Sequence, residues 1–336
     1  MNGSTPAAVH ADAGLTPPPP CRVCGSIRVA GRHTALEMMN GTREPFAYFQ
    51  CADCGCLQIE RIPADLARHY AGGYYSYTPP QRPANPLRRW AVHARHRWAL
   101  HGRDPFGWLM YRRAAAYAMR SLRPLELRPD TRLLDVGCGA GLLIFELAEL
   151  GYRSVLGIDP FIEADRAYDN GARVLKRGLD EASGCWDAVM FHHSFEHVPD
   201  PLATLRRTHA LLATGGRCLL RVPTVSSYAW QHYGVDWVQL DAPRHLYLFS
   251  RESITHLAAA TGFDVIDVAF DSDAFQFWGS EQYRRGIALR DERSHAVNPA
   301  AGLFSAAQLA DWARRAEELN QAGQGDQAAF VLRKRP

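Results

Sequence analysis

The stretch Leu133 to Gly141, LLDVGCGAG, constrains the fold of this chain more than any other. A short apolar run stops at three glycines, Gly137, Gly139 and Gly141, and a helical pattern begins at Leu142. This order predicts a buried parallel strand, a tight turn and a helix N-terminus. Glycines allow the turn a positive φ and let a ligand approach the backbone without meeting a Cβ atom. The stretch therefore predicts a ligand site at a strand end.

A second apolar run, SVLGID, ends in Asp159, 18 residues after Gly141. We expect this acid at the tip of the neighbouring strand, where a carboxylate can accept hydrogen bonds from both hydroxyls of a ribose. Several nucleotide-binding folds share a glycine turn followed by an acid, so further details must distinguish them.

The rest of the pattern alternates strands with helices, which indicates βαβ units and a mainly parallel, doubly wound α/β sheet. We expect strands over residues 132–136, 154–159, 173–176, 186–192, 217–222, 265–269 and 328–334. We expect helices over residues 142–150, 161–170, 201–212, 252–260 and 306–319, and a short element over 179–183.

The glycine spacing separates two kinds of nucleotide site. A dinucleotide fingerprint needs G-x-G-x-x-G, whereas this chain has G-x-G-x-G preceded by Asp135, which would repel a pyrophosphate but suits an ammonium group. The stretch resembles the D-x-G-x-G-x-G motif of class I S-adenosylmethionine-dependent methyltransferases. The resemblance continues through Asp159, the strand WDAVMF and the segment HHSFEHVPDP at 192–201. The alternative is a glycine turn on an unrelated α/β protein.

The resemblance implies a seven-stranded Rossmann-like sheet whose last strand is antiparallel, and a set of cofactor contacts. Asp135 would favour the ammonium of S-adenosylmethionine, and Asp159 would hold its ribose. The other implied cofactor-binding residues are Gly137, Cys138, Gly139 and Gly141 around the methionine part, Pro160 and Leu179 beside adenine, and Phe191 and His192 under the sulfonium. Cys138 has another interpretation, as a small side chain in a crowded turn.

Three histidines are candidate catalytic residues: His193, His197 and His245. A general base is needed only if the methyl acceptor arrives protonated. The alternatives are a loop-pinning role for His193 and a helix-start hydrogen bond for His197. Glu196-His197 also resembles part of a metal-binding pattern in some quinone-biosynthesis O-methyltransferases. Those enzymes have another acid where this chain has His193, so we expect no catalytic metal.

The insert at 223–250 is long for a connection in a compact α/β domain, which predicts a role in substrate binding. Among its residues we single out four aromatic and three polar side chains: Tyr228, Trp230, Tyr233, Trp237, Asp241, Arg244 and His245. Its P-R-H-x-x-x-F-S ending resembles the active-site stretch of sugar C-methyltransferases that also carry an N-terminal zinc module. Only His245 carries over, because the acid of their Tyr-x-Glu-His is missing. Arg244 instead offers a fork for a carboxylate or phosphate.

Two copies of C-x-x-C-G, Cys21 to Gly25 and Cys51 to Gly55, predict a zinc ribbon. The four thiolates of Cys21, Cys24, Cys51 and Cys54 suit a structural Zn²⁺ with no open position. Cys56 either competes with Cys54 or packs beside the site. We expect the ribbon to support or cap the catalytic domain, since it lacks a basic surface for nucleic acid.

The remaining segments predict the domain organisation. Residues 1–20 read as a disordered tail, 21–60 as the ribbon, 61–122 as a helical, arginine-rich connection, and 123–336 as the methyltransferase domain. In the connection we expect helices over 63–69, 88–100 and 107–122, and Gly72-Gly73 would free the chain to place Tyr74, Tyr75 and Tyr77. The resemblance to small-molecule methyltransferases implies that this Tyr-Tyr-Ser segment helps to close the cofactor pocket; the alternative is that the tyrosines are ordinary interface residues. Residues 82–132 hold twelve arginines against three acids, which indicates a solvated face or a platform for a diphosphate or membrane surface.

Together these features predict a methyltransferase acting at oxygen or carbon of a small or carrier-linked metabolite, such as an anionic sugar of a nucleotide or polysaccharide. Without an apolar run long enough to span a membrane, or a signal peptide, we expect a cytoplasmic protein. The alternatives are an RNA methyltransferase or nucleic-acid-binding protein using the ribbon and arginines, and a non-catalytic scaffold. Nucleic acid is not the partner we expect. The methyl acceptor and the oligomeric state stay open.

Overall fold

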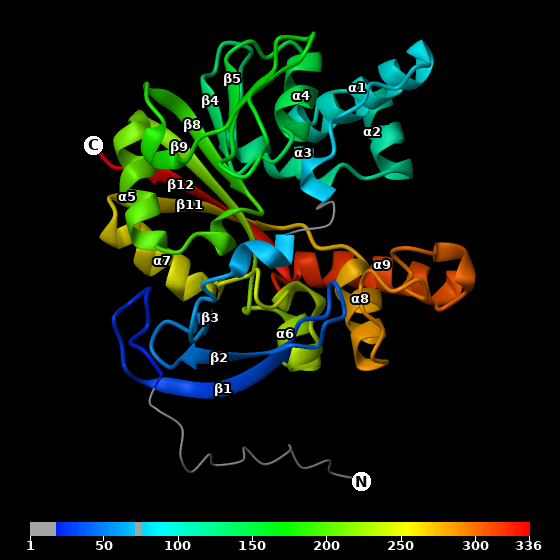
Figure 1. Cartoon of the computed structure of the whole chain (residues 1–336). Coiled ribbons are helices and arrows are strands. Elements are labelled where there is room, and N and C mark those ends of the chain that lie inside the picture. Colours follow the sequence, from blue (N-terminus) through cyan, green and yellow to red (C-terminus); the bar gives the residue numbers. More distant parts are fainter. Residues whose placement is uncertain (1–17, 71–74) are drawn as a thin grey trace.

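The predicted strands form one mixed sheet with the order β11-β12-β9-β8-β4-β5-β7-β6 (Figure 1). The computed structural model describes residues 18–70 and 75–336. The strands of this sheet are β4 (Leu133–Val136), β5 (Val155–Ile158), β6 (Arg166–Ala167), β7 (Arg173–Leu175), β8 (Trp186–His192), β9 (Leu212–Pro223), β11 (Phe263–Phe270) and β12 (Gln327–Lys334). Strand β12 runs antiparallel to both of its neighbours, and β4, β5, β7, β8 and β9 are parallel. The predicted doubly wound α/β fold is confirmed, with the two-residue strand β6 added at one edge.

Both faces of the sheet are buried, as parallel strands with continuous apolar runs require. Alternate residues of β8 point to opposite faces: Val189 and Phe191 join the cluster under α5 and α7, and Ala188 and Met190 join the cluster under α1 and α4. The helices are α1 (Pro86–His101), α2 (Pro105–Arg113), α3 (Tyr117–Ser121), α4 (Leu142–Glu149), α5 (Pro201–Leu211), α6 (Tyr228–Tyr233), α7 (Arg251–Ala260), α8 (Phe275–Arg284) and α9 (Ala306–Gln321).

The helix predicted over 161–170 is wrong. The segment forms turns and the short strand β6, held by local polar bonds. Asp165 accepts a hydrogen bond from the N–H of Lys176 (2.7 Å), and Asn170 accepts one from the N–H of Ala172 (3.1 Å). Asp and Asn side chains compete in this way with the backbone bonds of a helix.

The arginine-rich connection also differs in detail from its prediction. The helix expected over 88–100 lies within α1, but the single helix expected over 107–122 is two helices, α2 and α3. Ala114 has an extended backbone (φ −150°), which ends α2 despite the helix propensity of the alanine run. The helix expected over 63–69 is a short 3-10 turn, Leu66–Tyr70.

A second sheet, with the order β1-β2-β3-β10, joins the ribbon to the insert. Its strands are β1 (Val29–Leu36), β2 (Pro45–Cys51), β3 (Leu57–Ile59) and β10 (Tyr247–Leu248). Strand β10 comes from the insert and pairs antiparallel with β3, Tyr247 opposite Gln58 and Leu248 opposite Leu57. The ribbon therefore shares a sheet with the segment that carries His245.

The ribbon also shares its core with the large sheet. Tyr48 and Leu57 of the ribbon belong to the same buried cluster as Phe195 and Phe249, whose rings stack at 5.1 Å between centroids. The division into residues 1–20, 21–60, 61–122 and 123–336 stays a prediction, and most of the expected tail, residues 1–17, lies outside the described residues. Among residues 18–70 and 75–336, no helix has the length and apolar character needed to cross a bilayer.

Candidate functional site

The glycine turn after β4 has the predicted conformation. Gly137, Gly139 and Gly141 all have positive φ (74°, 56° and 81°). A Cβ atom on Gly139 would lie 2.3 Å from the carbonyl oxygen of Ser76, which accepts a hydrogen bond from the N–H of Ala140 (2.7 Å). The segment Tyr75–Tyr77 thus lies directly on the turn. The hinge glycines Gly72 and Gly73, and Tyr74, lie outside the described residues.

A cavity of about 370 Å³, here called the first cavity, opens at the carboxyl ends of β4, β5 and β8. Five of the predicted cofactor residues line it: Gly137, Asp159, Pro160, Leu179 and Phe191. Ser76, Tyr77 and Tyr70 line it from the connecting region, and His193 and His197 line it from the segment after β8. The cavity occupies the ligand position expected at the edge of a doubly wound sheet.

The two predicted acids lie on adjacent strands beside the first cavity. Asp159 accepts hydrogen bonds from the N–H groups of Gly139 (2.9 Å) and Phe161 (2.8 Å). Asp135 is buried behind the turn, and its Oδ1 has no hydrogen-bond partner among the described residues. Burial, together with the charge of Asp159, raises the pKa of Asp135 to about 8. Such a carboxyl gains a favourable interaction when a cation, directly or through water, reaches it.

Asp135, Cys138, Gly139, Gly141 and His192 are predicted cofactor residues that do not line the first cavity. Gly139 and Gly141 shape the turn. A Cβ atom on Gly157 would lie 2.5 Å from the sulfur of Cys138, so Cys138 packs in a crowded turn.

The His192 ring lies on the other face of β8, 3.4 Å from the hydroxyl of Ser121. Successive residues of a strand alternate in direction. Phe191 therefore faces the first cavity and His192 faces away from it.

A second cavity, of about 360 Å³, adjoins the first. Its lining combines the segment after β8, the insert, the ribbon loop, α8 and the strand ends of the large sheet. The lining residues are Met39, His193, His197, Arg221, Val238, Gln239, Asp241, His245, Asp273, Phe275, Tyr283, Leu289 and Gln327. His193 and His197 line both cavities. A molecule in one cavity is therefore close to a molecule in the other.

His193 is held on both sides. Its Nε2 accepts from the guanidinium of Arg221, and its Nδ1 lies 3.3 Å from Glu196 Oε1. Arg221 is itself bound to buried Asp271 (2.7 Å). His193 has a positive φ (56°), which is uncommon for a residue with a side chain. These contacts fit the loop-pinning alternative, since the lone pair of Nε2 is already used.

His197 and His245 each present an available ring nitrogen. Nδ1 of His245 lies 2.7 Å from the carbonyl of Gln239, and Nδ1 of His197 lies 2.8 Å from the carbonyl of Arg244. Because a carbonyl only accepts, both Nδ1 atoms carry the proton when the rings are neutral, and both Nε2 atoms carry a lone pair. Burial lowers the pKa of His197.

Glu196 lies beneath these rings. Its Oε1 is 3.9 Å from His245 Nε2, and its Oε2 has no hydrogen-bond partner among the described residues. Burial alone would raise the pKa of Glu196, but the hydrogen bond to His193 and the nearby imidazoles lower it to about 2. Glu196, His197 and His245 offer ligand atoms within 4.8 Å of one another. The cluster can stabilise a proton on His245 or hold a cation.

The guanidinium group of Arg244 is not accessible to a substrate, so the expectation that it binds a carboxylate or phosphate is wrong. The side chain is fully buried. It donates to Asp241 from Nε and Nη2, to Glu37 from Nη2 (3.1 Å) and to the carbonyl of His69 from Nη1 (3.2 Å). All three nitrogens are therefore used inside the protein.

The four aromatic residues singled out in the insert pack against other residues and do not line either cavity: Tyr228, Trp230, Tyr233 and Trp237. Trp237 is fully buried and donates to Asp326 (3.0 Å), and the Tyr233 hydroxyl donates to Glu281 (3.2 Å). Sequence reasoning missed Met39 and Arg221 in the second cavity. A charged residue between the apolar residues Leu220 and Val222 of strand β9 is a signal for Arg221; nothing in the sequence pattern points to Met39.

The four predicted zinc ligands come together at the end of the ribbon. The sulfurs of Cys21 and Cys54 are 3.6 Å apart, as are those of Cys24 and Cys51, and all four lie within 4.8 Å of one another. Four sulfurs about 2.3 Å from a tetrahedral Zn²⁺ would lie roughly 3.8 Å apart. Cys56 is buried with its thiol 3.7 Å from the carbonyl of Leu57, and it is outside the four-residue group.

Comparisons with known proteins agree with this site. A family model described as a methyltransferase domain matches residues 110–268, just under half of the chain. The fold, the glycine turn and the two acids make this region a methyltransferase domain of the S-adenosylmethionine-dependent class.

The curated relatives of the domain include ubiquinone biosynthesis O-methyltransferases. The protein from Methylocella silvestris is 36% identical over 168 residues, covering 44% of this chain and 64% of that protein. The protein from Xanthomonas campestris is 31% identical over 128 residues, covering 34% of this chain and 54% of that protein. The chain thus spans less than two thirds of the length of these relatives. Among solved structures, a mycolic acid cyclopropane synthase in complex with SAH has a TM-score of 0.44 and 20% identity, covering 67% of this chain and 85% of that chain.

Proposed function

We propose that the protein transfers a methyl group from S-adenosylmethionine to a hydroxyl oxygen of a small or carrier-linked metabolite. The observation that carries the proposal is the meeting of the two cavities at His193 and His197. The first cavity is bounded by the glycine turn and Asp159, and the second is rich in polar side chains. S-adenosylmethionine supplies a methyl group already activated on a sulfonium, so catalysis depends mainly on positioning.

The polar and apolar side chains that surround the first cavity match the chemical groups of S-adenosylmethionine. Asp159 would accept the ribose hydroxyls, Pro160, Leu179 and Phe191 would contact the apolar parts, and Asp135 would balance the ammonium from behind the turn. The curated relatives named as O-methyltransferases support oxygen as the acceptor. Arg221, Gln239, Asp241, Asp273 and Gln327 around the second cavity favour an acceptor with several hydroxyls, such as a sugar.

His245 would act as the general base. Its Nε2 carries the lone pair, and Glu196 Oε1 and Asp241 Oδ2, each 3.9 Å away, would stabilise the proton that it takes from the acceptor hydroxyl. With S-adenosylmethionine bound in the first cavity, the oxygen would bond to the methyl carbon as the carbon–sulfur bond breaks, and S-adenosylhomocysteine and protonated His245 would remain. The acid missing from the insert motif would be replaced by Glu196 from the segment after β8.

The four ribbon cysteines would hold a structural Zn²⁺, with Gln58 Nε2 donating to the Cys21 sulfur (3.0 Å) as an outer contact. Nucleic acid is disfavoured as the partner of the ribbon, because arginines of the ribbon already pair with acids or carbonyls of the same chain. Arg28 pairs with Asp53 (2.8 Å), Arg32 with Glu60 (2.9 Å), and Arg22 donates to the carbonyl of Ile59 (2.7 Å). A thiolate zinc site suits a reducing compartment, so we propose that the protein works in the cytoplasm.

The experiment is calorimetric titration of the full chain with S-adenosylmethionine, followed by a screen for S-adenosylhomocysteine release with hydroxylated acceptors. We expect micromolar-range binding, and loss of binding in Asp159→Ala but not in the exposed control Asp267→Ala. Equal affinity in the two variants would overturn the cofactor assignment. A gel shift with RNA, steeply weakened by salt, would instead favour the nucleic-acid alternative.

A further inference from the structure

The α1–α2 hairpin carries an exposed surface that the proposed active site does not use. In Figure 1 the two helices lie at the outer edge of the molecule, beyond α4 and away from the ribbon. Residues 86–113 contain seven arginines and a single acid, Asp104. The charge is therefore concentrated on one small element of a chain whose formal net charge is only +3.

The same hairpin exposes large apolar side chains. Leu87, Trp90, Phe106, Trp108 and Leu109 are each between 38% and 77% exposed. The rings of Trp90 and Phe106 are 4.4 Å apart between centroids, so α1 and α2 present them together. Scattered single apolar residues are normal on a surface, but a cluster of this kind marks an interaction site.

Exposed arginines stand close to these apolar residues in sequence. Arg88 and Arg89 lie between Leu87 and Trp90, and Arg103 lies three residues before Phe106. The guanidinium of Arg112 lies 5.2 Å from the Trp108 ring. Arginine beside tryptophan at the end of an apolar surface is the arrangement of interfacial helices, in which rings enter the headgroup region and guanidinium groups meet lipid phosphates.

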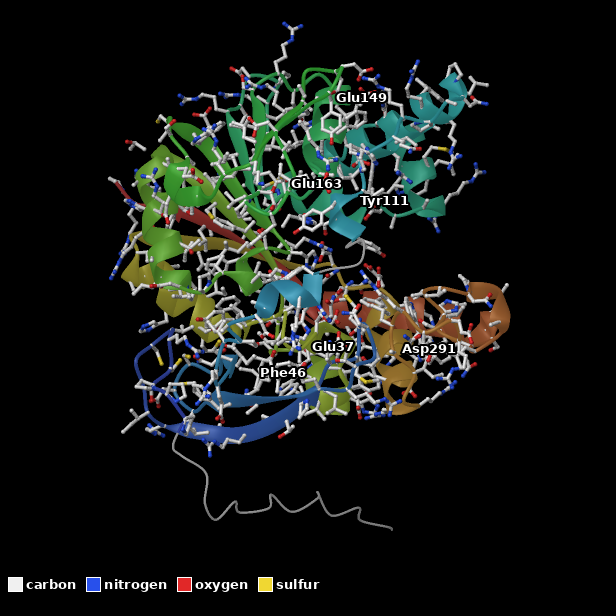
Figure 2. All side chains as sticks on the ribbon, in the orientation of Figure 1. Glu37, Phe46, Tyr111, Glu149, Glu163 and Asp291 are labelled. Atoms are coloured by element: carbon white, nitrogen blue, oxygen red, sulfur yellow. The ribbon has the colours of Figure 1, made fainter. Side chains whose placement is uncertain are left out.

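The hairpin is a rigid platform and not a loose arm. A Cβ atom on Gly107 would lie 2.2 Å from the carbonyl of Ala94, so α2 packs against the backbone of α1. The ring of Tyr111, labelled in Figure 2, packs at a tilt against Trp98 with 4.5 Å between centroids, and these contacts occupy the inner face. Arg82, just before α1, binds Glu149 of α4 (2.8 Å) and fixes the hairpin to the domain. The apolar side chains thus stay exposed because the inner face already has its partners.

We propose that this surface, made of Leu87, Trp90, Phe106, Trp108, Leu109 and the neighbouring arginines, docks the protein on an anionic lipid membrane. The charge complementarity is direct: six of the seven arginines are exposed, at positions 88, 89, 97, 103, 112 and 113, and Asp104 is the single opposing acid. Basic residues near an anionic leaflet each contribute to binding, and the inserted rings add apolar contact. The docking would be peripheral, and it is independent of the proposed catalytic function.

The test is flotation of the full chain with vesicles of phosphatidylcholine alone and with vesicles of equal parts phosphatidylcholine and phosphatidylglycerol. We expect binding to the mixed vesicles only, weakening as salt screens the charges. The double variant Arg88→Glu/Arg89→Glu should lower the partition coefficient more than about 25-fold. The control Arg61→Glu/Arg206→Glu has the same charge change at exposed positions outside the hairpin and should bind like the unaltered protein.

The aromatic part is tested separately by Trp90→Ala/Trp108→Ala, with Ile27→Ala/Val297→Ala as the exposed apolar control. We expect the tryptophan variant alone to lose binding while its affinity for S-adenosylmethionine is kept, which shows that the domain is folded. Equal binding of the variants and their controls would overturn the proposal. So would sedimentation showing a dimer that the tryptophan changes dissociate, or an RNA complex that the arginine changes abolish, because either result assigns the surface to another partner.

Discussion

Arg244 donates from Nη2 to Oε1 of Glu37 across 3.1 Å, and both side chains are fully buried. Glu37 begins the ribbon loop and accepts from the N–H groups of Asn40 (2.9 Å) and Thr42 (3.1 Å). Figure 2 labels Glu37 in the half of the molecule that contains the ribbon. Because His245 directly follows Arg244, this ion pair links the ribbon loop to the proposed general base.

Glu37→Gln should lower the free energy of unfolding by about 3 kcal/mol, because removal of one partner leaves a buried charge poorly compensated. Turnover should fall while the affinity for S-adenosylmethionine stays unchanged, since Glu37 is not part of the first cavity. Urea denaturation and calorimetry measure the two effects. The exposed pair of Arg28 and Asp53 gives the control: Asp53→Asn should cost no more than about 1 kcal/mol. Equal effects of the two changes would contradict the role of the pair.

The full chain should contain one zinc per molecule, measured by metal analysis of the purified protein. Cys24→Ser should lose the metal and unfold at a lower temperature, because three thiolates hold Zn²⁺ less well than four. Cys185→Ser, at an exposed cysteine outside the cluster, is the control and should keep the zinc. Cys56→Ala should also keep it. Loss of zinc in Cys56→Ala but not in Cys24→Ser would show that Cys56, and not Cys24, is the fourth zinc ligand.

The sequence predicts the central strands of the large sheet well because they carry short apolar runs, such as residues 188–191 of β8, that only a sheet covered on both faces can bury. Strand β8 occupies the expected residues, Trp186–His192. The helix expected over 161–170 fails because Asp165 and Asn170 accept hydrogen bonds from backbone N–H groups, of Lys176 and Ala172, and such bonds leave no trace in the apolar pattern from which the helix was predicted. The pairing of β10 with the ribbon was equally hidden, since it joins segments almost 190 residues apart.

The site residues also fall into those that the sequence predicts and those that depend on distant partners. Gly137 and Asp159 were predicted because turn geometry and strand order bring them to one sheet edge. The burial of Arg244 in an ion pair inside the protein could not be predicted, because its partner Glu37 is 207 positions away in sequence. Met39 lines the second cavity only because the ribbon loop packs on the segment after α8, where the N–H of Arg290 donates to the Met39 carbonyl (3.0 Å).

Affinity for S-adenosylmethionine should rise with pH between about 6 and 8, by up to about tenfold per unit, because the ammonium favours ionised Asp135 and burial holds its pKa at about 8. In the ligand-free protein the same raised pKa gives the folding stability the opposite dependence on pH. The unfolded chain binds fewer protons than the folded one between about pH 4 and 8, so stability falls as pH rises through this window. Asp135→Asn should flatten both profiles and weaken binding, whereas the exposed control Asp267→Asn should keep them. Calorimetry in buffers of different ionisation enthalpy measures the released proton; pH-independent affinity with no proton release would contradict the assignment.

His245→Gln should reduce kcat by roughly a hundred- to ten-thousand-fold, the usual contribution of a positioned general base. Its affinity for S-adenosylmethionine should be unchanged, because His245 lines only the second cavity. Glu196→Gln should give a smaller loss of kcat, since the base remains but the carboxylate that stabilises its proton is gone.

The readouts are single-turnover methyl transfer over a pH series and the zinc content of each variant. Because Glu196, His197 and His245 also offer three converging ligand atoms, turnover is measured after EDTA dialysis that leaves the ribbon zinc in place. Turnover that is unchanged by dialysis and by added Mg²⁺ would support the role of His245 as the general base. Turnover that is lost and then restored by Mg²⁺ would make His245 a metal ligand and remove it as the proton acceptor.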